Sequence, residues 1–423
     1  MPATAETHRR DYSRSPAGGR LAGVSFGMFM HYAASSPFVP PKPRWGCVFA
    51  AAFVLLPAVM GIPGCSGTGG GTGSRAAAPP AAAVDPPSLC DRIDAVIAHA
   101  RDGRLLDAGV QGAWQVVHGI LAFGPEFPVG VKGRTVPAID HLLDGGPITG
   151  WKLRRGDHGV IAIVEEGSTM GQGHPDQWLG YLSQCGVAVT EGDGRLAGGI
   201  PLETPLMVAG RRFTVGDLLA QAQHDIRPGQ EATWTLMALS AWLPPDASWT
   251  SRDGEAWTTE RVVRMEAQAD IVTAACGGTH RLYGLAAAID AHRRATAGEP
   301  TGGWAEAAAV LDESIDRARR FQQPDGSFSV HFFDRPAASP DVFATLAATG
   351  HIFEVLALAL DDERLTEPWV TRAADRLVTL LERTADVDVE CGGLYHAVHG
   401  LALYRRRICG TAGIPAALTP IDQ

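Results

Sequence analysis

Polar residues capable of acid, base or ligand chemistry recur at the start of apolar stretches throughout residues 89–423. Each is followed, after three residues, by a small or apolar residue and then an aliphatic one, as in HRLYGL and HIFEVL. We interpret each occurrence as the start of one inner helix, with the polar side chain on the inward face. Neighbouring occurrences are 45 to 71 residues apart, which is enough for two helices and their loops. The six positions are Gln115, His174, Glu231, His280, His351 and His396.

A second layer of polar or aromatic residues comes three positions after each of these, on nearly the same helical face. A core face would ordinarily be aliphatic there, and burying so many polar side chains without partners would cost more than the stability of a domain. We therefore expect both layers to line a wet or ligand-filled cavity, or to bond one another. The second layer is His118, Gln177, Trp234, Tyr283, Glu354 and His399.

The chemistry that these residue types suggest is proton transfer, because imidazole and carboxyl groups exchange protons near neutral pH. Helix N-termini at one mouth of a cavity would also favour an anionic substrate group. The structural alternative is that a histidine at a helix start caps the helix or bonds a loop carbonyl. The candidate catalytic residues are Glu231, His280, His351, His396, Glu354 and Tyr283, and the candidate ligand-binding residues are Gln115, His118, His174, Gln177, Trp234 and His399.

Two CGG segments place a cysteine close to a histidine, as in Cys276 with His280 and Cys391 with His396. Thiolate and imidazole are ligand types that suit zinc. The alternative, which we favour at this stage, is that CGG forms a tight turn at a helix start with a small buried cysteine. The sequence analysis accordingly predicts no metal site and leaves the cofactor unknown. The chain also lacks a Gly-rich phosphate loop, an H-E-x-x-H segment and a nucleophile elbow.

Composition excludes some classes of partner. The chain has 423 residues, 45% of them hydrophobic and 19% charged, with a formal net charge of −10. Residues 1–64 hold six basic and two acidic groups, which leaves −14 for the remainder. A nucleic-acid-binding surface is not expected on so acidic a body.

The apolar run CVFAAAFVLLPAVMGIPG, residues 47–64, has the features of an export signal. Lys42 and Arg44 precede it, and Ile62-Pro-Gly-Cys65 resembles the lipobox of bacterial lipoproteins. We expect Cys65 to be lipidated and to anchor the protein in a membrane of the cell envelope, with ordinary signal cleavage or an uncleaved anchor as alternatives. Residues 1–46 are expected to be a disordered extension, and a start at Met28 or Met30 would give a more usual signal length.

The remainder divides into a tether and a folded body. Residues 66–88 are rich in Gly, Ala and Pro without apolar periodicity, which is typical of a flexible linker. The body, residues 89–423, is expected to be one domain built of repeats. Its five cysteines cannot all pair internally, although one or two disulfides could form after export. They are Cys90, Cys185, Cys276, Cys391 and Cys409.

The segments between the six positions carry apolar residues at helical spacing, as in WAEAAAVLDESIDRARRF and TRAADRLVTLLERT. Residues 125–173 are the exception, since VKGRTVPAI and HGVIAIVEE have the pattern of short strands. We therefore expect a mainly all-α domain, an (α/α)6 toroid of helix hairpins with a small β-containing insertion. Six inner helices would surround a central cavity, and six outer helices would cover them.

The body resembles the superfamily of terpenoid cyclases and protein prenyltransferase β-subunits. Gln323-Pro-Asp-Gly-Ser-Phe328 is similar to a turn that recurs in those toroids, and Gly393-Leu-Tyr-His396 is similar to an inner-helix segment of the β-subunits. The resemblance implies the toroid fold and a zinc ligand at His396. The D-x-D-D and D-D-x-x-D motifs of the cyclases are absent from the sequence. Other segments resemble an uncharacterised bacterial family of exported toroid proteins.

From these features we expect the protein to bind a small apolar, isoprenoid-like ligand in a cavity lined by His and Glu. Chemical transformation of that ligand is an option. One alternative is a carbohydrate-active lyase or hydrolase, because (α/α)6 barrels often carry that activity. The other is a non-enzymatic scaffold of the cell envelope. An open groove with two carboxyl groups would favour the first alternative, and mutually bonded inner polar groups with no free space would favour the second.

Overall fold

The computed structural model describes residues 87–166, 168, 173–185 and 199–410, and the backbone of two short strands at 188–189 and 196–197. Contacts divide the chain after Pro80 into two units, and all described residues belong to the second. The expectations for the extension 1–46, the signal 47–65 and nearly all of the tether 66–88 therefore lie outside the described residues.

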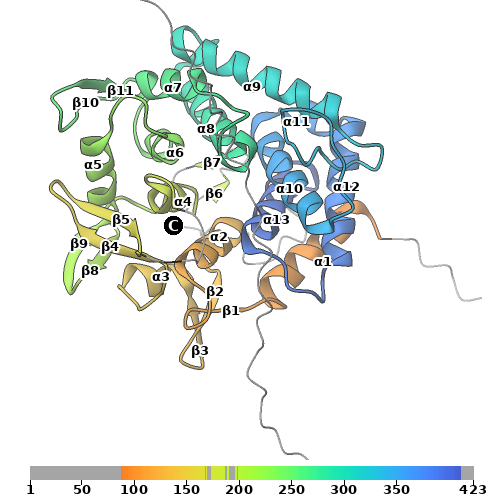
Figure 1. The fold of residues 1–423 in the computed structure, drawn as a ribbon, viewed down its shortest axis with the longest axis horizontal. Helices are drawn as coiled ribbons and strands as arrows, with labels where there is room; N and C mark the ends of the chain where they lie inside the picture. Colours follow the sequence, from red (N-terminus) through yellow and green to blue (C-terminus); the bar gives the residue numbers. More distant parts are fainter. Residues whose placement is uncertain are drawn as a thin grey trace, which may run out of the picture. The chain divides into compact units, whose positions relative to one another are not determined.

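The described residues are mainly helical, which confirms the expected mainly all-α class. Helices that surround the centre alternate along the chain with helices that cover them, from α1 to α13 (Figure 1). The helices are α1 (Leu89–Asp102), α2 (Ala113–Phe123), α3 (Ala138–Leu143), α4 (Gln177–Cys185), α5 (Val215–Asp225), α6 (Thr233–Trp242), α7 (Thr259–Gln268), α8 (Thr279–Thr296), α9 (Gly302–Phe321), α10 (Val342–Ala359), α11 (Asp362–Leu365), α12 (Pro368–Arg383) and α13 (Cys391–Ile408), with a 3-10 turn η1 (Ala275–Gly278) before α8.

Six helices pack against one another in a closed cycle. Helix α2 contacts α4, α4 contacts α6, and the series continues through α8, α10 and α13 back to α2. We call these six the inner helices. Helices α10 and α13 run parallel, because Gly350 of α10 faces Ala397 of α13 while Gly400 of α13 faces Glu354 of α10, so that both sequence numbers rise together. A Cβ atom on Gly350 would lie 2.7 Å from the Cβ of Ala397, so the close approach of these two helices requires glycine.

The outer helices owe their positions to amphipathic sequences. In α12, for example, Trp369, Val370, Ala373, Leu377 and Leu380 are buried at helical spacing. Helix α1 packs on α12 and α13, α5 on α6, α7 and α9 on α8, and α12 on α10. Apolar residues of inner and outer helices join in one continuous core.

Short β-hairpins precede three outer helices, α3, α5 and α7. Two of them turn through residue pairs with positive φ, Lys132-Gly133 (50° and 77°) and Ala209-Gly210 (49° and 74°). These values fit the tight turns that join twisted antiparallel strands. The strands are β1 (Leu106–Asp107), β2 (Pro128–Val131), β3 (Arg134–Pro137), β4 (Trp151–Arg155), β5 (Val160–Val164), β6 (Ala188–Val189), β7 (Leu196–Ala197), β8 (Pro205–Val208), β9 (Arg211–Thr214), β10 (Ser248–Thr250) and β11 (Ala256–Thr258).

This arrangement corrects the expectation of a single β-containing insertion at residues 125–173. Strands do occur there, but the hairpins β8–β9 and β10–β11 lie beyond it. The segments V-K-G-R and V-A-G-R each supply a two-residue turn between residues that pair across the hairpin. The error came from treating the strands as an interruption of the helical repeat, whereas hairpins recur as part of it.

A disulfide joins Cys90 in α1 to Cys409 at the end of α13, with 5.8 Å between the Cα atoms. Cys185, Cys276 and Cys391 are free thiols. Among the described residues, α10 alone is long and apolar enough to cross a membrane. It is largely buried between α8, α12 and α13, as a core helix would be.

Candidate functional site

Four histidines from different inner helices meet at the centre of the cycle. They are His118 of α2, His280 of α8, His351 of α10 and His396 of α13, and we call them the histidine cluster. The His351 and His396 ring centroids are 4.1 Å apart, and the other adjacent pairs lie 5.0 to 5.4 Å apart. All four side chains are buried.

Glu354 of α10 is clamped between two imidazoles of α13. Its Oε2 accepts a hydrogen bond from Nδ1 of His396 at 2.8 Å, and its Oε1 accepts one from Nδ1 of His399 at 2.6 Å. Burial alone would raise the pKa of Glu354, but the two histidines outweigh burial and hold that pKa well below its ordinary value. Glu354 is therefore a buried carboxylate with both oxygens occupied, and it fixes the proton on Nδ1 of each partner.

Burial and neighbouring imidazoles disfavour positive charge in the cluster. Burial and His396 lower the pKa of His351 to about 3 and that of His118 well below its ordinary value. The pKa of His280 is also lowered well below its ordinary value by the same two causes. These three rings are therefore neutral at pH 7, each with one N–H and one lone pair.

A tyrosine that sequence reasoning missed completes the wall of the cluster. Tyr181 of α4 donates its hydroxyl proton to Nε2 of His118 at 2.7 Å, and Nδ1 of His118 donates to the carbonyl of Trp114. Gln177, one turn before Tyr181, contacts the same hydroxyl at 3.4 Å. The helical spacing of Tyr181 from Gln177 was the available signal, because residues four apart share a helix face.

His174 and Glu231 lie just before α4 and α6 and bond each other, with 2.8 Å between Nδ1 and Oε2. The ring of Trp234 contacts both His174 and His280, so this pair adjoins the histidine cluster. Gln115 instead accepts a bond from the backbone N–H of Gly112 and caps its own helix. Gln115 therefore stabilises the start of α2 and is not part of the histidine cluster.

The sequence interpretation placed His351 at the start of an inner helix, and that placement is wrong. Helix α10 begins at Val342, nine residues earlier. The preceding turns, VFATLAATG, are apolar and carry no polar marker of a helix start beyond Asp341, which caps α10 through the N–H of Phe343. The side chain of His351 still reaches the cluster because α10 extends past its neighbours.

The two CGG segments adopt different structures. Cys276, Gly277 and Gly278 all have positive φ, from 51° to 82°, and form the turn that leads into α8. Cys391 begins α13, and its two glycines lie within the first helical turn. Atoms that could ligate a metal on Cys276, His280 and His351 lie within 4.8 Å of one another. Burial and nearby carboxylates raise the pKa of the Cys276 thiol to about 12.

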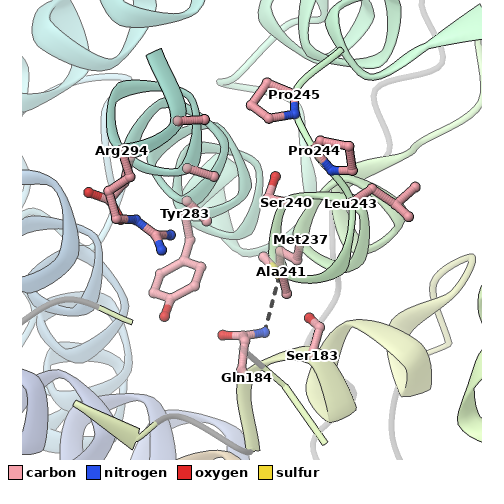
Figure 2. Close-up of a pocket in the computed structure, with 14 residues that line it drawn as sticks. Ser183, Gln184, Met237, Ser240, Ala241, Leu243, Pro244, Pro245, Tyr283 and Arg294 are labelled. Carbon is pink, nitrogen blue, oxygen red and sulfur yellow. Dashed lines mark hydrogen bonds and ion pairs between the residues drawn. The ribbon is translucent and has the colours of Figure 1, made fainter. Parts of the chain in front are cut away.

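The other end of the inner helices holds a pocket of about 340 Å³. Its wall is formed by the last turns of α4 and α6, by the loop that follows α6, and by one face of α8 from Tyr283 to Ala295. Figure 2 shows Tyr283 extending from α8 toward Gln184 on α4, and the Gln184 amide bonded to the sulfur of Met237. The lining residues are Ser183, Gln184, Met237, Ser240, Ala241, Leu243, Pro244, Pro245, Tyr283, Ala287, Asp290, Ala291, Arg294 and Ala295.

Two buried polar groups lack partners among the described residues. The hydroxyl of Tyr283, on the pocket wall, makes no hydrogen bond with them. Nε of Arg406, in the last turn of α13, likewise has no partner among them, and burial lowers the pKa of this guanidinium. The ring of Tyr283 lies 6.2 Å from that of His399, centroid to centroid. Sequence reasoning missed Arg406, because an arginine in a run of three at a helix end usually faces solvent.

The comparisons with known proteins add no relative. No protein-family model, curated protein or solved structure matches the chain. The arrangement of the site is therefore the basis for a functional proposal.

Proposed function

We propose that residues 89–423 form an (α/α)6 toroid that binds a small molecule in the pocket bounded by α4, α6 and α8. The closed cycle of six inner helices, which alternate along the chain with outer helices, supports the toroid. On this proposal the chain is similar in architecture to terpenoid cyclases and prenyltransferase β-subunits.

The observation that carries the binding proposal is the unpartnered Tyr283 hydroxyl on the pocket wall. A buried hydroxyl without a hydrogen bond costs free energy, so a polar ligand atom at this position would be favoured. Tyr283 is thus the group expected to contact the polar end of the ligand.

The rest of the pocket indicates the class of ligand. Met237, Leu243, Pro244 and several alanines provide an apolar wall, while Arg294 provides a cation that is already ion-paired with Asp290. A small number of polar groups within an apolar lining is typical of sites for small organic ligands. We propose an apolar, isoprenoid-like molecule with one polar or anionic group, on which proton transfer is the candidate reaction.

The two alternative functions fit less well. Glycoside hydrolysis uses a pair of carboxyl groups, and among the described lining residues Asp290 supplies the one carboxylate. A scaffold is favoured by the mutual bonding of Glu354, His396 and His399, but not by the pocket next to Tyr283. We retain a cell-envelope scaffold as the second candidate.

Export and lipid anchoring through Cys65 remain part of this proposal. The disulfide between Cys90 and Cys409 supports an oxidising location, because such bonds rarely persist in the cytoplasm. The partners proposed are thus a small molecule and a membrane.

Native mass spectrometry of the purified full chain tests ligand binding. We expect a co-purified small molecule that is lost in Ala291→Phe, where the new ring fills the pocket. The control is Ala309→Phe, on the exposed side of α9. A chain that carries no small molecule, and that binds no apolar fluorescent probe in an Ala291-dependent way, would refute the proposal and favour the scaffold.

A further inference from the structure

Three side chains that can ligate a metal gather on one side of the histidine cluster. They come from separate places in the chain: Cys276 from the turn before α8, His280 from α8 and His351 from α10. Their ligand atoms lie within 4.8 Å of one another. His280 and His351 are buried, whereas Cys276 is partly exposed, so the group lies beneath the surface and remains reachable.

The hydrogen bonds indicate which nitrogen of His280 is available to a metal ion. Nε2 of His280 lies 3.3 Å from Nε2 of His396, and Nδ1 of His396 donates to Glu354. Nδ1 of His280 is buried and has no hydrogen-bond partner among the described residues. Nδ1 is therefore the nitrogen of His280 that can face a metal ion.

The same reasoning applies to His351. Its Nδ1 donates to the backbone carbonyl of Ala347 at 2.8 Å, which leaves the lone pair on Nε2. His118 differs, because the Tyr181 hydroxyl already occupies its lone pair. Two histidines of the cluster thus present unused lone pairs, and a thiol lies next to them.

We propose that Cys276 Sγ, His280 Nδ1 and His351 Nε2 bind one transition-metal ion of the zinc class, with the fourth coordination position open. Imidazole and thiolate are the ligands that such ions prefer, and three protein ligands with an open position are typical of catalytic zinc. On binding, Cys276 loses its thiol proton to solvent and its sulfur forms the bond to the metal.

Groups that can orient the ligating rings are already present. A ligating histidine normally donates its other N–H to a carboxylate, a carbonyl or water, which orients the ring. His351 does so to Ala347, and Nε2 of His280 lies against His396, which is itself held by Glu354. Ligand atoms on a tetrahedral zinc ion lie roughly 3.3 to 3.8 Å apart. The three side chains therefore need to move closer together on binding, and the turn at Gly277 and Gly278 leaves Cys276 on a loop rather than in a helix.

The proposal differs from what the prenyltransferase resemblance implies. That resemblance would make His396 a metal ligand. Here His396 instead contacts Nε2 of His280, the nitrogen that does not bind the metal. The site is also separate from the pocket at the other end of the helices, so it does not depend on the proposed small molecule. Its test measures metal rather than ligand binding or activity.

Metal content of the purified full chain is the first measurement. We expect one zinc per chain by elemental analysis after dialysis. After removal of that zinc by a chelator, cobalt(II) should restore one equivalent and give the near-ultraviolet absorption of a cobalt thiolate. Cys276→Ser should lose the thiolate absorption, and His351→Gln should lose stoichiometric binding. Cys391→Ser, the matched change at the other CGG, should retain both.

His396→Asn is expected to weaken metal binding about 10- to 100-fold without abolishing it, as changes behind a ligand commonly do. Alkylation of the wild-type chain avoids any folding defect of the variants. Zinc should slow alkylation of Cys276 and leave Cys391 unaffected, as read by peptide mapping. The proposal would be overturned if the folded wild-type chain bound no metal. It would also be overturned if Cys391→Ser lost the thiolate absorption and Cys276→Ser kept it.

Discussion

The two ends of the inner helices use polar side chains in opposite ways. At the histidine cluster, Glu354 and the rings around it are joined by short hydrogen bonds. At the pocket, the Tyr283 hydroxyl has no hydrogen-bond partner among the described residues. Buried polar groups that bond one another stabilise a fold, whereas unsatisfied groups beside a cavity are available to a ligand. The difference separates polar groups that maintain the structure, such as Glu354, from groups that are available to a ligand, such as the Tyr283 hydroxyl at the pocket and Nδ1 of His280 in the cluster.

The largest expected effect is at Glu354. Glu354→Ala leaves two buried imidazole N–H groups without an acceptor, so we expect a loss of about 3–5 kcal/mol in the free energy of unfolding. Urea unfolding followed by circular dichroism provides the measurement. Glu313→Ala is the control, because Glu313 is exposed on α9 and its ion pairs with Arg317 and Arg320 are screened by solvent, so the loss should be much smaller. Equal losses in the two variants would mean that the hydrogen bonds of Glu354 with His396 and His399 do not stabilise the fold.

Asp176 lies just before α4, at the same end of the inner helices as the histidine cluster. Replacing it tests whether a negative charge at this end lowers the stability of the fold. Burial raises the pKa of Asp176 from 3.8 to about 6, despite a hydrogen bond from Thr235. The folded chain therefore holds this proton more tightly than the unfolded chain, and stability falls as the pH rises from about 4 to about 6. Asn accepts the same bond and tolerates the positive φ of 56°.

Asp176→Asn should accordingly raise stability by about 1–2 kcal/mol at pH 7 and by almost nothing below pH 4, after allowance for partial exposure. Unfolding midpoints measured across this pH range give the comparison. Asp290→Asn, at the pocket, removes an ion pair with Arg294 and should not stabilise at any pH. If Asp290→Asn raised the stability by the same amount, the two ends of the inner helices would not differ in how they tolerate negative charge.

The smallest effect comes from a matched pair of tyrosines. Tyr181→Phe removes the hydroxyl that donates to His118 and should cost about 1–2 kcal/mol. Tyr283→Phe removes a buried hydroxyl without a partner among the described residues, so it should not lower the free energy of unfolding and should raise it by about 1 kcal/mol. The same change at Tyr283 should weaken retention of the co-purified molecule. If Tyr283→Phe destabilised the chain as much as Tyr181→Phe, the Tyr283 hydroxyl would stabilise the fold and would not be available to a ligand.

Much of the architecture was predictable because helical periodicity is a local property. The outer helices α9 and α12 coincide with the amphipathic segments identified in the sequence. The recurrence of polar residues in apolar helices likewise indicated a polar interior. Hairpins were predicted less well, since their strands are two to five residues long and their pairing depends on turns such as Ala209-Gly210.

The sequence by itself determined the helical class, the acidic body and the residue types available for chemistry, because these depend on composition and short-range spacing. Only the tertiary structure decided which of them meet. Cys90 and Cys409 pair across 319 residues. Cys276, rather than Cys391, lies within reach of two histidines, although both precede Gly-Gly. A thiol, an imidazole and a carboxylate become a site only when separate helices bring them within a few ångströms, and the closed packing of the inner helices does so here.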